Sequence, residues 1–150
     1  MKKRQLLSLG LCLALIGLLI GCASSVDSDY REWSGKTSDL LSRDLQNFNN
    51  VFGIAMEREI ESQARATAIH YAEQLRDHAE SALTEDNYDV SSKWEESQQN
   101  YRKALSDYRD AGQYMSSGLA ISDKNKIERG MAYISSGATN MKAAIETMPE

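Results

Sequence analysis

Residues 127–148 read IERGMAYISSGATNMKAAIETM and carry the most regular pattern in the chain. An apolar side chain recurs every three or four residues, which matches the 3.6-residue turn of an α-helix. The recurring positions are Ile127, Met131, Ile134, Ala138, Met141, Ile145 and Met148. One face of this predicted helix is therefore apolar, and partner helices must cover it.

The rest of the chain also favours helices. Its only proline is Pro149, it has only three valines, and no stretch shows strand-type alternation. Helical stripes of apolar residues occupy about 29–50, 54–83 and 94–119, and Ser92-Lys93-Trp94-Glu95 resembles a capping box. These patterns predict an all-α fold, an antiparallel up-down-up-down four-helix bundle.

The boundary between the first two helices has two interpretations. Asn49-Asn50 and Gly53 favour a turn, which would separate two helices. The apolar stripe nevertheless continues in phase through Phe52 and beyond, as one long helix would require. The alternative architecture is therefore a three-helix bundle with one long first helix.

The last two helices are expected to form a hairpin that turns at Ile121-Ser122-Asp123. Residues whose numbers sum to about 244 would then face each other. This register places Tyr108 against Ser136 and Gly137, and Tyr133 against Ala111 and Gly112. Residues 114–118 (YMSSG) and 133–137 (YISSG) echo each other, which we interpret as a packing feature rather than a sequence repeat.

The N-terminus has the three parts of an export signal. Lys2, Lys3 and Arg4 form a positive segment, residues 6–20 are uncharged and rich in leucine, and small residues follow. The segment ends in Leu19-Ile20-Gly21-Cys22, which resembles the lipobox of prokaryotic lipoprotein precursors. An uncleaved membrane anchor is a poorer interpretation, because 15 apolar residues fall short of the roughly 20 that span a bilayer. An ordinary secretory signal would not explain the cysteine at this position.

The resemblance implies a diacylglyceryl group on the Cys22 thiol and cleavage just before Cys22. The expected organisation is a signal peptide (residues 1–21), a lipidated tether (22–29) and a helical bundle domain (30–150). Tyr30 and Trp33 would lie near the lipid, where an interfacial role is conceivable. Core packing is the favoured interpretation, because both residues lie on the stripe of the first helix.

Charge and cysteine content restrict the function of the mature chain. Cleavage would leave 14 basic and 22 acidic residues, a net charge of −8, which argues against nucleic acid and against adhesion to anionic lipid. Cys12 leaves with the signal and Cys22 carries the lipid, so no disulfide and no thiolate metal site is expected.

The candidate site residues are few. His70, Glu73, Asp77 and Glu80 share one face of the second helix, which could bind a divalent cation, although a solvated acidic face is the favoured interpretation. His78 lies on the apolar stripe and is expected to be a hydrogen-bonded core residue.

The remaining chemistry-bearing residues do not suggest a site. Met131, Met141 and Met148 alternate with isoleucines and are expected to pack in the core. The sequence contains no phosphate-binding glycine loop and no nucleophile elbow, so we expect neither an enzyme nor a cofactor.

Together these features predict a non-enzymatic binding or scaffolding module, anchored in the cell envelope by the lipid on Cys22, with another envelope protein as its partner. Ala23 after the cysteine, rather than aspartate, would indicate the outer membrane in a cell with two membranes. The alternative is an envelope carrier that holds a metal ion or a small apolar ligand in the bundle.

Overall fold

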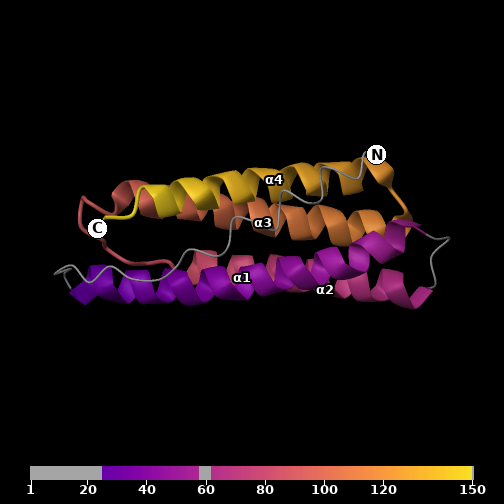
Figure 1. Ribbon diagram of the computed structural model, residues 1–150, viewed down its shortest axis with the longest axis horizontal. Coiled ribbons are helices and arrows are strands. Elements are labelled where there is room, and N and C mark those ends of the chain that lie inside the picture. The colour runs from indigo at the N-terminus through magenta and orange to yellow at the C-terminus, as the bar shows by residue number, and fades with distance from the viewer. Residues whose placement is uncertain (1–24, 58–61, 150) are drawn as a thin grey trace.

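The computed structural model describes residues 25–57 and 62–149, and its helices form an antiparallel bundle (Figure 1). The bundle contains α1 (Ser25–Glu57), α2 (Ser62–Glu85), α3 (Glu95–Ile121) and α4 (Lys124–Glu146). Each helix packs against the next one along the chain. The predicted all-α four-helix bundle is confirmed. Among the described residues, no helix has both the length and the apolar character needed to cross a membrane.

The predicted turn at Asn49–Gly53 is wrong, because α1 continues without interruption to Glu57. The rings of Phe48 and Phe52 stack with their centroids 5.1 Å apart, and both are buried in the main core. Burial of this pair outweighs the local preference of Asn49 and Gly53 for a turn. The three-helix alternative is also wrong, because α1 and α2 are separate helices that pack on each other.

The predicted tether is shorter than expected. Residues 25–29 form the first turn of α1, and only residues 22–24 of the tether lie outside the described residues. Asp27 is 5% exposed and accepts a hydrogen bond of 2.8 Å from the backbone N–H of Ser91. This long-range bond fastens the start of α1 to the segment that joins α2 to α3.

The helix caps also differ from the prediction. The expected capping box is wrong, because α3 begins at Glu95 and its N-cap, Trp94, makes no side-chain cap bond. The clear cap belongs to α4, where the Asp123 carboxylate accepts from the backbone N–H groups of Asn125 and Lys126. Ser122, just before it, has a left-handed backbone (φ 56°) that closes the hairpin.

The predicted register of α3 against α4 is confirmed for the contact of Tyr108 with Gly137 and wrong for the contact of Tyr133 with Gly112. A Cβ atom added to Gly137 would lie 2.7 Å from the Tyr108 ring, so this ring covers Gly137 as predicted. Tyr133 instead stacks on Tyr114 at 5.5 Å. Gly112 faces α2, where an added Cβ would lie 2.4 Å from the carbonyl oxygen of Ala72. The period of a helix identifies a face, but it does not say which neighbour covers that face.

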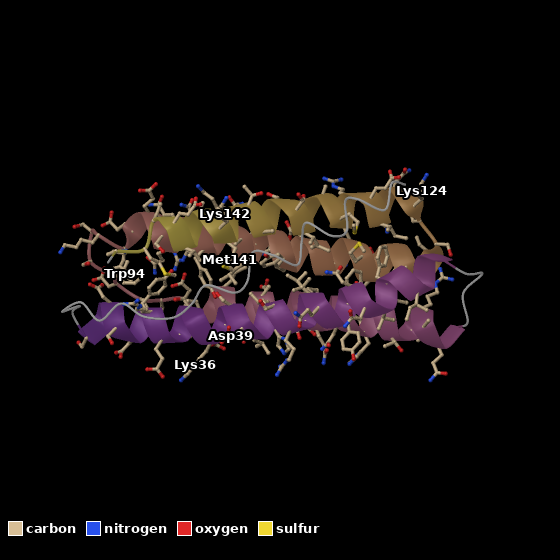
Figure 2. The ribbon with its side chains drawn as sticks, viewed as in Figure 1. Lys36, Asp39, Trp94, Lys124, Met141 and Lys142 are labelled. Atoms are coloured by element: carbon tan, nitrogen blue, oxygen red, sulfur yellow. The ribbon has the colours of Figure 1, made fainter. Side chains whose placement is uncertain are left out.

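The two ends of the bundle are formed by different segments of the chain (Figure 1). We call one the Ser25 end; it comprises the first turn of α1, residues 86–94 and residues 146–149. The other we call the Ile121 end, formed by the last described turn of α1 and the α3–α4 hairpin. Trp94 lies near the Ser25 end and Lys124 at the Ile121 end (Figure 2).

Candidate functional site

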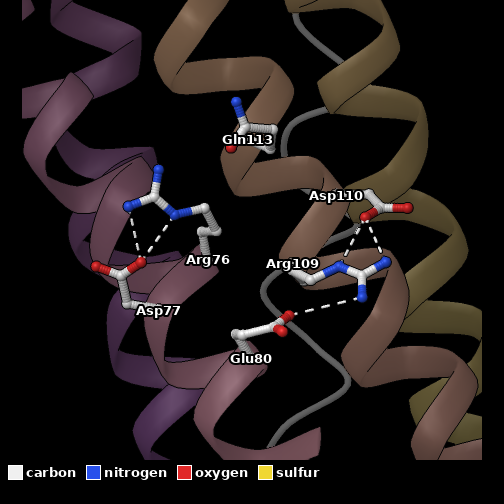
Figure 3. A pocket seen from close by; sticks show the side chains of 6 residues that line it. All are labelled: Arg76, Asp77, Glu80, Arg109, Asp110 and Gln113. Carbon is white, nitrogen blue, oxygen red and sulfur yellow. Dashed lines mark hydrogen bonds and ion pairs between the residues drawn. The ribbon is translucent and has the colours of Figure 1, made fainter.

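A cleft of about 270 Å³ lies on the surface between α2 and α3 (Figure 3). Both helices contribute charged or polar side chains to its lining: Arg76, Asp77, Glu80, Arg109, Asp110 and Gln113. The two helices approach closely here because Gly112 has no side chain to hold them apart. The outward-pointing residues on either side of this contact therefore form the walls of the cleft.

The charges in the cleft are satisfied by one another. The Arg76 guanidinium lies 2.7 Å from the Asp77 carboxylate, and Arg109 lies 2.8 Å from Asp110 and 3.6 Å from Glu80. The hydrogen bond to Asp77 raises the pKa of Arg76, and the bond to Asp110 raises that of Arg109, so both remain charged. The cleft is thus lined by ion pairs, of which the Arg109–Glu80 pair joins α2 to α3.

The face of α2 that was weighed as a weak candidate for cation binding is not assembled into a ligand set. His70 is exposed with its ring against Tyr71, and Asp77 is bonded to Arg76. Over residues 25–57 and 62–149, no three His, Cys, Asp or Glu side chains are grouped so that they could hold a metal ion. Glu73 lies near enough to Arg76 for its negative charge to help raise the pKa of that guanidinium. Its observed role is therefore electrostatic.

His78 is hydrogen-bonded, as predicted, although it is only partly buried. Its Nδ1 and Oδ2 of Asp44 share a hydrogen bond of 2.5 Å, and the Asp44 side chain is 3% exposed. The bond joins α2 to α1. Sequence reasoning missed Asp44, whose position on the otherwise apolar face of α1 was the available signal.

The methionines pack among apolar side chains. Met141 is buried in the main core, Met131 packs against that core, and Met148 packs against a second cluster that contains Tyr30. The main core has no room for a water molecule between Phe48 and its neighbours. These positions match the predicted packing role.

A group of five aromatic rings from three parts of the chain lies at the Ser25 end and joins the second cluster to the main core. Its members are Tyr30, Trp33, Tyr88, Trp94 and Tyr101, which we call the five-ring cluster. Contacting ring centroids are 5.3–6.5 Å apart. Tyr30 and Trp33 thus pack as predicted, while the roles of Tyr88, Trp94 and Tyr101 in this cluster were missed.

The hydroxyl groups in the five-ring cluster differ in their partners. Tyr101 donates to the carbonyl oxygen of Ser34 at 3.0 Å, whereas the buried Tyr30 hydroxyl has no hydrogen-bond partner among the described residues. Burial raises the pKa of both phenols above the usual range for tyrosine. Both therefore stay neutral, and neither is suited to act as a base.

Asp86 secures the loop beside the five-ring cluster. Its fully buried carboxylate accepts from Arg102 Nε at 2.6 Å and from Gln98 Nε2 at 2.9 Å. The Arg102 guanidinium also donates to the backbone carbonyl of Asp86. A buried carboxylate with this many donors serves to hold the chain in place.

Cys22, the predicted lipidation site, lies outside the described residues. Comparison of the chain with protein-family models, with curated proteins and with solved structures yields no match.

Proposed function

We propose that this protein is a lipid-anchored, non-enzymatic binding or scaffolding module of the cell envelope. The location rests on the export signal and on Leu19-Ile20-Gly21-Cys22, whose cysteine would carry the lipid. Two acyl chains on one residue would make a durable anchor, because each buried methylene contributes about 0.8 kcal/mol. The mature chain carries net negative charge, so its membrane attachment depends on the lipid rather than on a basic patch.

One observation carries the non-enzymatic part of the proposal: within residues 25–57 and 62–149, the three buried carboxylates serve as cross-links between elements. Asp27 binds the backbone at Ser91, Asp44 binds His78, and Asp86 binds Arg102. The side chain of a catalytic acid or base must come within hydrogen-bond reach of the substrate. These three carboxylates are instead oriented toward partners within the bundle, as a structural module requires.

The shape of the bundle suits a scaffold. α1 alone has 33 residues, which corresponds to a rod about 50 Å long. Two large apolar side chains are exposed at the Ile121 end: Ile54 (61% exposed), near the end of α1, and Ile121 (66% exposed), the last residue of α3. We propose another envelope protein as the partner, with this end available for contact.

The test separates a scaffold from a carrier. Residues 23–150 are melted by circular dichroism with chelator and with added zinc, copper or calcium. The scaffold proposal predicts the same melting temperature in every condition. A ligand at a hundred times its dissociation constant stabilises the folded state by about 2.7 kcal/mol. A rise of several degrees with one ion that is lost in the His70→Ala variant would instead favour the carrier.

A further inference from the structure

The distance between the predicted lipid and the bundle is short. Three peptide steps separate Cys22 from Ser25, the first residue of α1, and an extended chain covers at most about 3.6 Å per step. Ser25 therefore lies within about 11 Å of the lipidated residue. If Cys22 carries the lipid, the chain length between the two residues limits how far the Ser25 end can move from the membrane surface.

The Ser25 end is also rigid, because its parts are bonded to one another. Asp27 in the first turn of α1 holds the backbone of Ser91, and Gln98 Nε2 donates to the carbonyl oxygen of Tyr88 at 2.9 Å. With the Asp86–Arg102 pair, these bonds fix residues 86–94 against α1 and α3. When the lipid places the first turn of α1 at the membrane, the loop is placed there with it.

The side chains of this end suit the headgroup layer. Val26 is exposed, while Trp33, Tyr88 and Met148 are half-buried members or neighbours of the five-ring cluster. Tryptophan and tyrosine with one apolar and one polar side favour the interface between hydrocarbon and water. The packing role of the rings is compatible with this position, because Trp33 and Tyr88 remain partly exposed, whereas the other three rings are buried.

The charge of this end selects the kind of lipid. Its exposed acidic residues are Asp29, Asp89 and Glu146, and its exposed basic residue is Lys93. Carboxylates at the headgroup level are repelled by anionic phosphates, whereas the ammonium groups of zwitterionic lipids can approach them.

We propose that the Ser25 end of the bundle is a membrane-contact surface that rests on zwitterionic lipid headgroups, so that the Ile121 end projects away from the membrane. This inference rests on the proposed lipid anchor at Cys22. α3 has 27 residues, so the two ends are about 40 Å apart.

The test uses the full chain, processed and acylated in a bacterial host and reconstituted into phosphatidylcholine vesicles. Two exposed positions are compared, in a Val26→Cys variant and an Ile121→Cys variant, each labelled with a thiol-reactive fluorophore. A small fraction of lipid with a nitroxide on its headgroup quenches any fluorophore nearby. If Cys22 carries lipid and Cys12 has been removed, each variant has only one thiol to label.

The expected result is several-fold stronger quenching at position 26 than at position 121. Phosphatidylglycerol should weaken the quenching at position 26, and added salt should restore it. Equal quenching at the two positions, whether strong or weak, would overturn the membrane-contact surface, and so would indifference to phosphatidylglycerol. Uptake of the fluorophore by the wild-type protein would show a free Cys22, which would contradict the proposed anchor itself.

Discussion

Gly112 lies where α2 and α3 approach each other closely, and replacing it with alanine gives a direct test of the packing. An added Cβ would lie 2.4 Å from the Ala72 carbonyl oxygen and 2.7 Å from the Arg76 backbone nitrogen. Both atoms belong to the backbone of α2, so no side-chain rotation relieves the clash. The helices would have to move apart by about an ångström, since ordinary contacts begin near 3.5 Å.

The size of the effect follows from two opposing contributions. Alanine in a helix is favoured over glycine by about 1 kcal/mol, while overpacking a close contact costs about 1–3 kcal/mol. Because the clash at Gly112 is with backbone, we place its cost at the upper end, about 3 kcal/mol. The Gly112→Ala variant should therefore lose about 2 kcal/mol, which lowers the melting temperature by roughly 8 °C in a domain of this size.

Three other glycines provide matched controls. Gly35 and Gly53 have nothing within 4 Å of the Cβ position, so their alanine variants should gain about 0.5–1 kcal/mol. Gly137 faces the Tyr108 ring, which can shift, so Gly137→Ala should fall between these and Gly112→Ala. Thermal and urea melts of the four variants should give this order. A Gly112→Ala protein as stable as Gly35→Ala would refute the close α2–α3 packing.

Three further predictions concern buried polar groups. Tyr30→Phe should leave the free energy of unfolding unchanged or raise it, because the Tyr30 hydroxyl has no partner among the described residues. Tyr101→Phe should lower the free energy of unfolding by about 1 kcal/mol, because the bond to Ser34 is lost. Urea titrations of both variants measure this order, and the reverse order would contradict it. Burial raises the pKa of both tyrosines in the folded state. The free energy of unfolding of the wild type should therefore be highest below the unfolded-state pKa near 10 and should fall as the pH rises above it. A free energy of unfolding that stays constant to higher pH would count against this burial. Asp44→Asn should lower the free energy of unfolding by about 1–3 kcal/mol, measured in urea melts at neutral pH, because it weakens the bond to His78. An unchanged urea midpoint would mean that this bond contributes nothing to stability.

The sequence predicted the helices well where a periodic pattern and its neighbours agreed. The stripe of residues 127–148 predicted α4, and a hairpin turn near Ser122 predicted that Gly137 would face Tyr108. At residues 49–53 the local and periodic signals disagreed, and the periodic one prevailed because Phe48 and Phe52 are buried together. Local turn propensity is weaker than the burial of two aromatic rings.

The features that were missed depend on contacts between distant residues. Asp27 appeared to belong to a polar tether, but its partner Ser91 lies 64 positions further along the chain. The five-ring cluster likewise joins residues from α1, the α2–α3 segment and α3. Spacing within one segment carries no information about such pairs, so the Ser25 end could be recognised only from the folded chain.

The central claim is that the mature protein begins at Cys22 and is held in the envelope by lipid on that residue. Mass spectrometry of the N-terminal peptide, isolated from the membrane fraction of a bacterial host that expresses the full chain, measures both features at once. We predict a peptide that begins at Cys22 and carries diacylglyceryl, with a longer, unmodified precursor in the Cys22→Ser variant. A mature N-terminus at another residue, an unmodified Cys22, or normal processing of the Cys22→Ser variant would contradict the claim.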